Sequence, residues 1–136
     1  MNPGRAYVSN TVNSATPGQL IVMLYDGLMR FAGDARDELV AGRTGAEPIS
    51  RAIRILTELS RCLRPDASPE LCRNLANLYQ FYTVELSKAM HEQKPERIDK
   101  IIPLIQELRD AWQVAEDKNS GNETGDAPPP SAPPAA

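Results

Sequence analysis

Few side chains in this sequence have the type and spacing that metal binding or covalent catalysis needs. The two cysteines, Cys62 and Cys72, could form a redox pair or a metal clip, but no histidine lies near them. The only histidine, His91, is preceded three positions earlier by Lys88, so the Glu-x-x-His motif of two-metal helical bundles is missing. We therefore interpret the cysteines as small apolar residues and His91 as a solvated residue at a helix end. No metal site and no cofactor are predicted.

Acid–base catalysis and nucleotide binding are weakly supported as well. Asp26 and Glu85 are the acids closest to apolar positions, but a general acid and a general base must converge in one pocket. The sequence contains no glycine-rich loop of the Rossmann or Walker type. We interpret both acids as residues at the edge of a core and expect no catalytic residues and no enzyme. A metal-free helical enzyme would need charged groups that face inward.

The length and the net charge of the chain limit the classes of protein to which it could belong. The chain has 136 residues, which suits one domain, and its formal net charge of -3 disfavours nucleic acid as a partner. No apolar run reaches the length of a membrane span. The first fifteen residues lack the apolar centre of a secretory signal, so we expect a cytoplasmic protein.

The elements that must position these side chains are helices, and the first has a clear start signal. Thr16 can cap a helix whose first residue is Pro17, and Gln19 can close a capping box with Thr16. Gly42 ends the segment, so we expect a helix from residue 17 to about 41. Its apolar positions recur at helical spacing and are Leu20, Ile21, Leu24, Leu28, Phe31, Ala32, Ala35 and Leu39.

Two further helices follow after short connections. The second is expected to end near residue 64, and Thr44 with Glu47 is a candidate capping box at its start. The third is expected over 69–91, with Ser68 as its cap. Both segments carry apolar residues at helical spacing, and no segment of the chain alternates as a strand does.

The fourth helix contains a local conflict. It opens at Lys94-Pro95, but Pro103 falls in its interior, where proline kinks or breaks a helix. Either the helix bends at Pro103, or a short turn precedes a helix that starts there. We favour the bend, because the apolar pattern continues without a change of phase.

These patterns predict an all-α protein: an antiparallel up-down four-helix bundle over residues 16–118. Residues 1–15 form a polar leader that Tyr7 and Val8 interrupt, either as a clip onto the bundle or as ordinary exposed residues. Residues 119–136 are rich in proline and small residues and are expected to be a disordered C-terminal tail.

The helices carry more apolar residues than a bundle needs, which is about three per heptad. The surplus either forms a groove for an amphipathic partner helix or widens the core stripe, including the packing of a homodimer. The additional residues are Met23, Tyr25 and Met29 in the first helix, Ile55, Leu59 and Cys62 in the second, and Tyr79, Phe81 and Val84 in the third.

Four motifs, in the same order along the chain, resemble the FliS family of flagellar secretion chaperones. The most specific is Leu-Ile-Val-Met-Leu-Tyr-Asp-Gly at 20–27, preceded by the Ser-Ala-Thr-Pro start signal. The others lie at 51–59, at 74–82 and at 108–112, the last reading Leu-Arg-Asp-Ala-Trp. One departure is that Phe81 and Tyr82 stand where the family has a Tyr-Met pair.

The resemblance implies a cytoplasmic, non-enzymatic export chaperone. Its partner would be the disordered C-terminal segment of flagellin, which becomes partly helical as it wraps the bundle and is kept from polymerising before type III secretion. The resemblance gives Tyr7 and Val8 the role of a leader cap over the groove. The expected groove residues are Ile55, Leu59, Leu75, Leu78, Tyr79 and Tyr82. The alternative is a structural bundle whose surplus apolar surface forms a homodimer.

Overall fold

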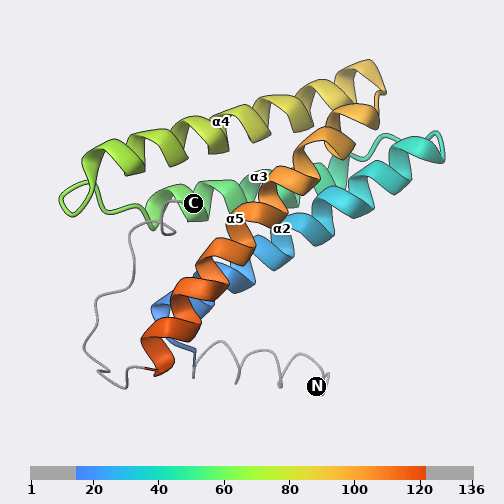
Figure 1. The fold of residues 1–136 in the computed structure, drawn as a ribbon. Coiled ribbons are helices and arrows are strands. Elements are labelled where there is room, and N and C mark those ends of the chain that lie inside the picture. The colour runs from blue at the N-terminus through green and yellow to red at the C-terminus, as the bar shows by residue number, and fades with distance from the viewer. Residues whose placement is uncertain (1–14, 122–136) are drawn as a thin grey trace, which may run out of the picture.

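The structure is a computed structural model that describes residues 15–121, and these residues form four helices. The helices are α2 (Pro17–Val40), α3 (Ala46–Arg61), α4 (Pro69–Glu92) and α5 (Glu96–Gly121). Figure 1 shows them as long rods joined by short turns, and no strand occurs within the described range. The all-α, up-down bundle predicted from the sequence is confirmed. None of these four helices combines the length and the apolar content that crossing a bilayer requires.

The start of α2 is the capping box that the sequence predicts. The Thr16 hydroxyl accepts a hydrogen bond from the Gln19 backbone N–H at 3.1 Å, and the Gln19 side chain accepts one from the Thr16 N–H at 2.9 Å. Pro17 is the first helical residue, where no N–H is needed. Two of the helix's first donors are therefore paired, which fixes where α2 begins.

The start of α3 differs from the prediction. Gly45 is the N-cap, with φ at 68°, and the Thr44 hydroxyl accepts from the Ala46 N–H at 3.3 Å instead of pairing with Glu47. The positive φ suits glycine, and a Cβ there would also press on the Ala35 carbonyl oxygen. The predicted capping box is thus wrong, because a left-handed turn brings the chain into α3. The helix ends at Arg61 rather than near residue 64.

Helices α4 and α5 form the second hairpin. Pro69 opens α4 as predicted, but the side chain of the N-cap Ser68 makes no capping bond. Gln93 ends α4 in a left-handed conformation with φ at 54°. The last helix is continuous through Pro103, so the alternative of a new helix starting there is wrong. It also continues to Gly121, beyond the expected bundle boundary at 118.

The four helices close a ring around one core. Helix α2 packs against α3 and α5, and α4 packs against the same two helices from the other side. The large side chains at the centre come from all four helices and include Tyr25, Leu28, Leu56, Leu59, Tyr82, Leu86, Ile98, Ile101, Ile105 and Trp112. Burial of these apolar groups is the main stabilising contribution to the fold.

Candidate functional site

The six residues predicted to line a groove do not share one exposed face. Four of them, Leu59, Leu75, Tyr79 and Tyr82, are at most 2% exposed and belong to the core. Leu78 is 36% exposed, and Ile55 is half-buried. In this conformation a partner can reach only Leu78 and Ile55; the other four become accessible only if the bundle opens locally. The predicted leader cap, Tyr7 and Val8, lies outside the described residues.

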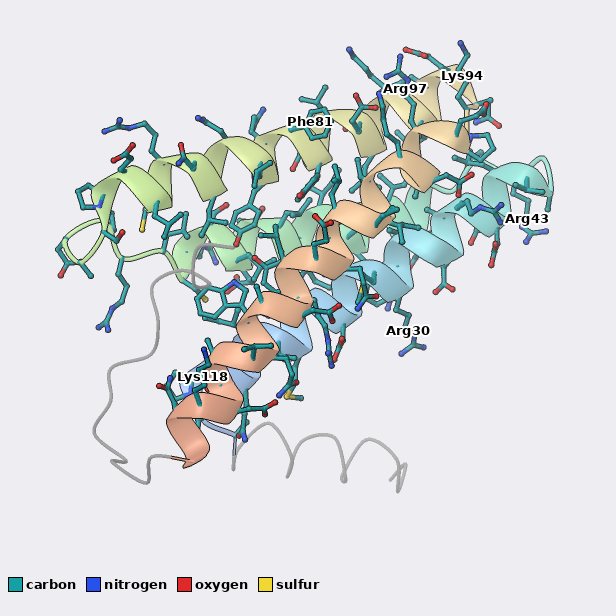
Figure 2. The ribbon with its side chains drawn as sticks, in the orientation of Figure 1. Arg30, Arg43, Phe81, Lys94, Arg97 and Lys118 are labelled. Atoms are coloured by element: carbon teal, nitrogen blue, oxygen red, sulfur yellow. The ribbon has the colours of Figure 1, made fainter. Side chains whose placement is uncertain are left out.

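A row of exposed apolar residues follows the outer side of α4. Leu78, Phe81 and Val84 are spaced three residues apart and are 36%, 38% and 37% exposed. Figure 2 shows Phe81 on the side of α4 that no other described helix covers. We call these three residues the α4 row. The sequence pattern counted all three as apolar but did not separate them from the core stripe of α4, which runs through Leu75, Tyr79, Tyr82 and Leu86.

Ile55 lies away from the α4 row and lines an open hollow of about 540 Å³ along α2 and α3. The aromatic ring of Phe31 forms one wall, and the guanidinium of Arg51 lies 5.6 Å from the ring centre. Arg51 is also paired with Glu47 at 2.9 Å. The hollow is therefore lined by two apolar residues, Phe31 and Ile55, among polar and charged residues of α3.

Three aromatic residues with polar groups meet inside the bundle. The hydroxyl oxygens of Tyr25 and Tyr79 are 2.5 Å apart in a buried hydrogen bond, and their ring centres are 6.5 Å apart. Trp112 of α5 is 2% exposed, and its indole N–H makes no hydrogen bond of regular geometry within residues 15–121, but it interacts with the Tyr25 hydroxyl closely enough to oppose the effect of burial on the pKa of Tyr25. Burial raises the pKa of Tyr25 to about 12 and also raises the pKa of Tyr79. Both hydroxyls are therefore protonated at neutral pH.

The two acids that were singled out in the sequence are held in ion pairs with α5. Glu85 is 6% exposed and pairs with Arg97 at 3.0 Å, and Arg97 also contacts Glu92 at 3.1 Å. Figure 2 places Arg97 near the end where α4 and α5 join. Asp26 of α2 pairs with Arg109 at 2.9 Å. Each of these two carboxylates connects its own helix to α5, and each is engaged in an ion pair with an arginine of α5.

A further buried carboxylate links the end of α5 to the start of α2. Glu116 is 6% exposed and accepts a hydrogen bond of 2.5 Å from the Thr16 hydroxyl. Gly18 leaves the room that this carboxylate fills, since a Cβ at Gly18 would overlap a Glu116 carboxylate oxygen. The N-terminus of a helix favours a negative charge, so this position stabilises the first turn of α2.

The remaining chemistry-bearing residues are dispersed. Cys62 is exposed at the end of α3, Cys72 is buried in α4, and both thiols are free. Partial desolvation at the end of α3 raises the pKa of the Cys62 thiol, and the nearby Glu58 carboxylate raises it further, which makes the thiol a poor nucleophile at neutral pH. His91 is exposed near the end of α4. Within residues 15–121, no group of three or more His, Cys, Asp and Glu side chains is placed to hold a metal ion.

Comparisons with known proteins agree on one family. The family described as "Flagellar protein FliS" matches residues 1–119. The flagellar secretion chaperone FliS of Salmonella typhimurium is 32% identical over 120 residues, which cover 86% of this chain and 89% of the relative. The protein of the same name from Bacillus subtilis is 31% identical over 117 residues, which cover 84% of this chain and 86% of the relative. The protein of the same name from Vibrio cholerae is 25% identical over 107 residues, which cover 77% of this chain and 79% of the relative. With a helical bundle and a family match over most of its length, this chain belongs to the FliS family of flagellar secretion chaperones.

Proposed function

We propose that this chain binds the disordered C-terminal segment of flagellin in the cytoplasm and keeps it from polymerising before type III secretion. A flagellar secretion chaperone requires a flagellar export substrate as its partner, and the relatives carry that name. The structural observation that supports the proposal most is accessible apolar surface on two separate parts of the bundle. Neither the proposed binding nor the protection of the segment needs catalysis or a cofactor.

The two apolar surfaces fit a long unfolded segment better than a small folded partner. The α4 row lies on the outer side of α4, whereas Ile55 faces the hollow along α2 and α3. A disordered segment can wrap a large surface and order as it binds, so it can cover both places at once. An amphipathic helix within that segment would place apolar residues three or four positions apart against the α4 row.

The groove residues taken from the resemblance divide into two groups in this proposal. Ile55 and Leu78 contact the segment directly, because both are accessible. The buried residues Leu59, Leu75, Tyr79 and Tyr82 support that surface from below and contact the segment where the bundle opens. Residues 16–118 form the binding unit, and Tyr7 and Val8 of the 1–15 leader cover the apolar surface until the substrate displaces them.

Substitution within the α4 row tests the proposal. Leu78→Asp should weaken binding of a flagellin C-terminal peptide at least about tenfold, because a buried leucine contact contributes roughly 1.5–3 kcal/mol and a carboxylate opposes it. Val114→Asp is the matched control, since Val114 is an exposed apolar residue of α5 outside the row. Fluorescence anisotropy of a labelled peptide measures both affinities. Equal affinity of Leu78→Asp and wild type, with helicity intact by circular dichroism, would reject the α4 row.

The alternative occupant of the α4 row is a second copy of this chain. Light scattering across a dilution series distinguishes the two, because a chaperone with free apolar surface should be monomeric at low concentration. A dimer that persists on dilution and excludes the peptide would favour the structural homodimer over the proposed function.

A further inference from the structure

Two open hollows along α2 and α3 join into one groove. The first is the hollow of about 540 Å³ beside Ile55, and a second of about 430 Å³ continues it toward the turn between the two helices. Phe31, Glu47 and Arg51 line both hollows, and we call the two together the α2–α3 groove. Phe31 is half-buried, and the guanidinium groups of Arg30 and Arg51 lie 5.8 Å and 5.6 Å from its ring centre.

The α2–α3 groove has the features that recognise an acidic, proline-rich segment. Proline-rich segments dock into grooves that contain aromatic rings. Phe31 supplies such a ring, and Ile55 extends the apolar surface along α3. Glu47 and Glu58 are paired with arginines of α3, whereas Arg54 lines the groove without an ion-pair partner among residues 15–121. A segment that carries carboxylates therefore finds an available cation there.

The chain itself contains such a segment after α5. Residues 122–136, which we call the proline-rich segment, contain five prolines at 128–130, 133 and 134. They also contain the two acids Glu123 and Asp126, and no Lys, Arg or His. A proline-rich sequence favours the extended polyproline II conformation, so it loses little conformational freedom when it binds.

The distance from the end of α5 to the groove follows from contacts at two glycines of α2. A Cβ added at Gly18 would meet Glu116, and one added at Gly27 would meet Ile55. The near end of the groove therefore lies beyond Glu116 along α2 by about 14 Å, at 1.5 Å per helical residue. Gly121 ends α5 on the other side of Glu116, which adds about 8 Å.

We propose that the proline-rich segment docks into the α2–α3 groove of its own chain, with its prolines against Phe31 and Ile55 and its carboxylates near Arg54. At roughly 3.3 Å per extended residue, Pro128 reaches up to about 23 Å from Gly121, and Pro134 up to about 43 Å. The prolines can therefore cover the separation along α2 and pass around one helix, which is about 10 Å wide. Because the segment is tethered, a weak contact is enough.

Docking in this groove makes the proline-rich segment a competitor of the substrate. In the proposed function the substrate segment also contacts Ile55, so it must displace the proline-rich segment from that residue. This consequence rests on the proposed function, whereas the docking itself does not.

Paramagnetic broadening in the ¹⁵N-labelled full chain measures the docking. A nitroxide is attached at Ser131→Cys after Cys62→Ser and Cys72→Ala remove the native thiols, and circular dichroism confirms that helicity is intact. The amide signal of Phe31 should lose intensity relative to the reduced label, while that of Val84 in the α4 row should not. No loss at Phe31, or equal loss at both residues, would overturn the docking. Loss at Phe31 in a mixture of nitroxide-bearing ¹⁴N chain with label-free ¹⁵N chain would overturn docking within one chain in favour of a second copy.

Charge reversal tests which surface holds the segment. Arg54→Glu should reduce the broadening at Phe31, because it repels the two carboxylates of the segment. Arg73→Glu is the matched control, since Arg73 is an exposed arginine of α4 that does not line the groove. Glu123→Lys together with Asp126→Lys should restore the broadening in the Arg54→Glu chain. Equal broadening in the two arginine variants, or no restoration by the lysines, would overturn the docking.

Titration of the nitroxide-labelled chain with the flagellin C-terminal peptide tests the competition. The Phe31 signal should recover intensity in step with the anisotropy of the labelled peptide. An anisotropy increase without recovery at Phe31 would overturn the competition while leaving the proposed function standing. An unchanged anisotropy with Phe31 still broadened would contradict the proposed function while leaving the docking standing.

Discussion

The buried tyrosines keep the centre of the bundle neutral. Tyr25, Tyr79 and Tyr82 are at most 2% exposed, and a phenolate at any of these positions would lose most of its hydration. Burial raises the pKa of Tyr25 and of Tyr82 to about 12 and shifts that of Tyr79 in the same direction. The hydrogen bond between Tyr25 and Tyr79 therefore forms between two neutral hydroxyls.

These raised pKa values predict alkaline destabilisation. Unfolded tyrosines ionise near pH 10 and the folded Tyr25 and Tyr82 only near 12, so above pH 10 the unfolded chain binds fewer protons. Their contribution to the free energy of unfolding should be fully present below about pH 10 and lost as the pH rises toward 12. Urea unfolding at several pH values measures the slope. Tyr82→Phe keeps the ring but removes one hydroxyl, so its slope should be smaller; identical slopes would contradict the burial of Tyr82.

At this scale the sequence singled out the apolar residues of the candidate site but not which of them are accessible in the folded bundle. Leu59 and Leu75 lie on the faces of α3 and α4 that the other helices cover, and the Tyr79 hydroxyl finds a partner on α2. Spacing shows which residues share a helix face, but burial depends on neighbouring helices that are distant in sequence.

At the scale of elements, the four helices were predictable because periodicity and start signals agree. The capping box of α2 and Pro69 at the start of α4 depend on adjacent residues, so the sequence contains the whole signal. The start of α3 was missed because Gly45 adopts a left-handed conformation against α2, which is a tertiary contact. Pro103 is tolerated because it lies on the exposed side of α5, where water can pair the carbonyl that loses its donor.

Pro103 also gives a prediction for stability. Pro103→Ala should restore a helical N–H and raise the free energy of unfolding by about 2 kcal/mol, a gain reduced by the greater freedom of the unfolded chain. Thermal and urea unfolding measure the change. Lys100→Ala, at an exposed position of the same helix, should change stability by less than about 0.5 kcal/mol. A destabilised Pro103→Ala would mean that the proline sets a bend on which the packing of α5 depends.

At the scale of the whole molecule, the bundle combines a closed core with accessible apolar surface at separate places. Ion pairs and the Thr16–Glu116 bond connect α2 and α4 to α5, in addition to the apolar core that all four helices share. The α4 row and the hollow beside Ile55 remain accessible. This combination suits a chaperone that stays folded while an unfolded substrate binds and leaves.

Calorimetric titration of the full chain with a flagellin C-terminal peptide at moderate salt tests the central claim most directly. The account predicts saturable heat with one peptide bound per chain, and a complex that stays together on gel filtration. Absence of heat together with separate elution of chain and peptide would contradict it.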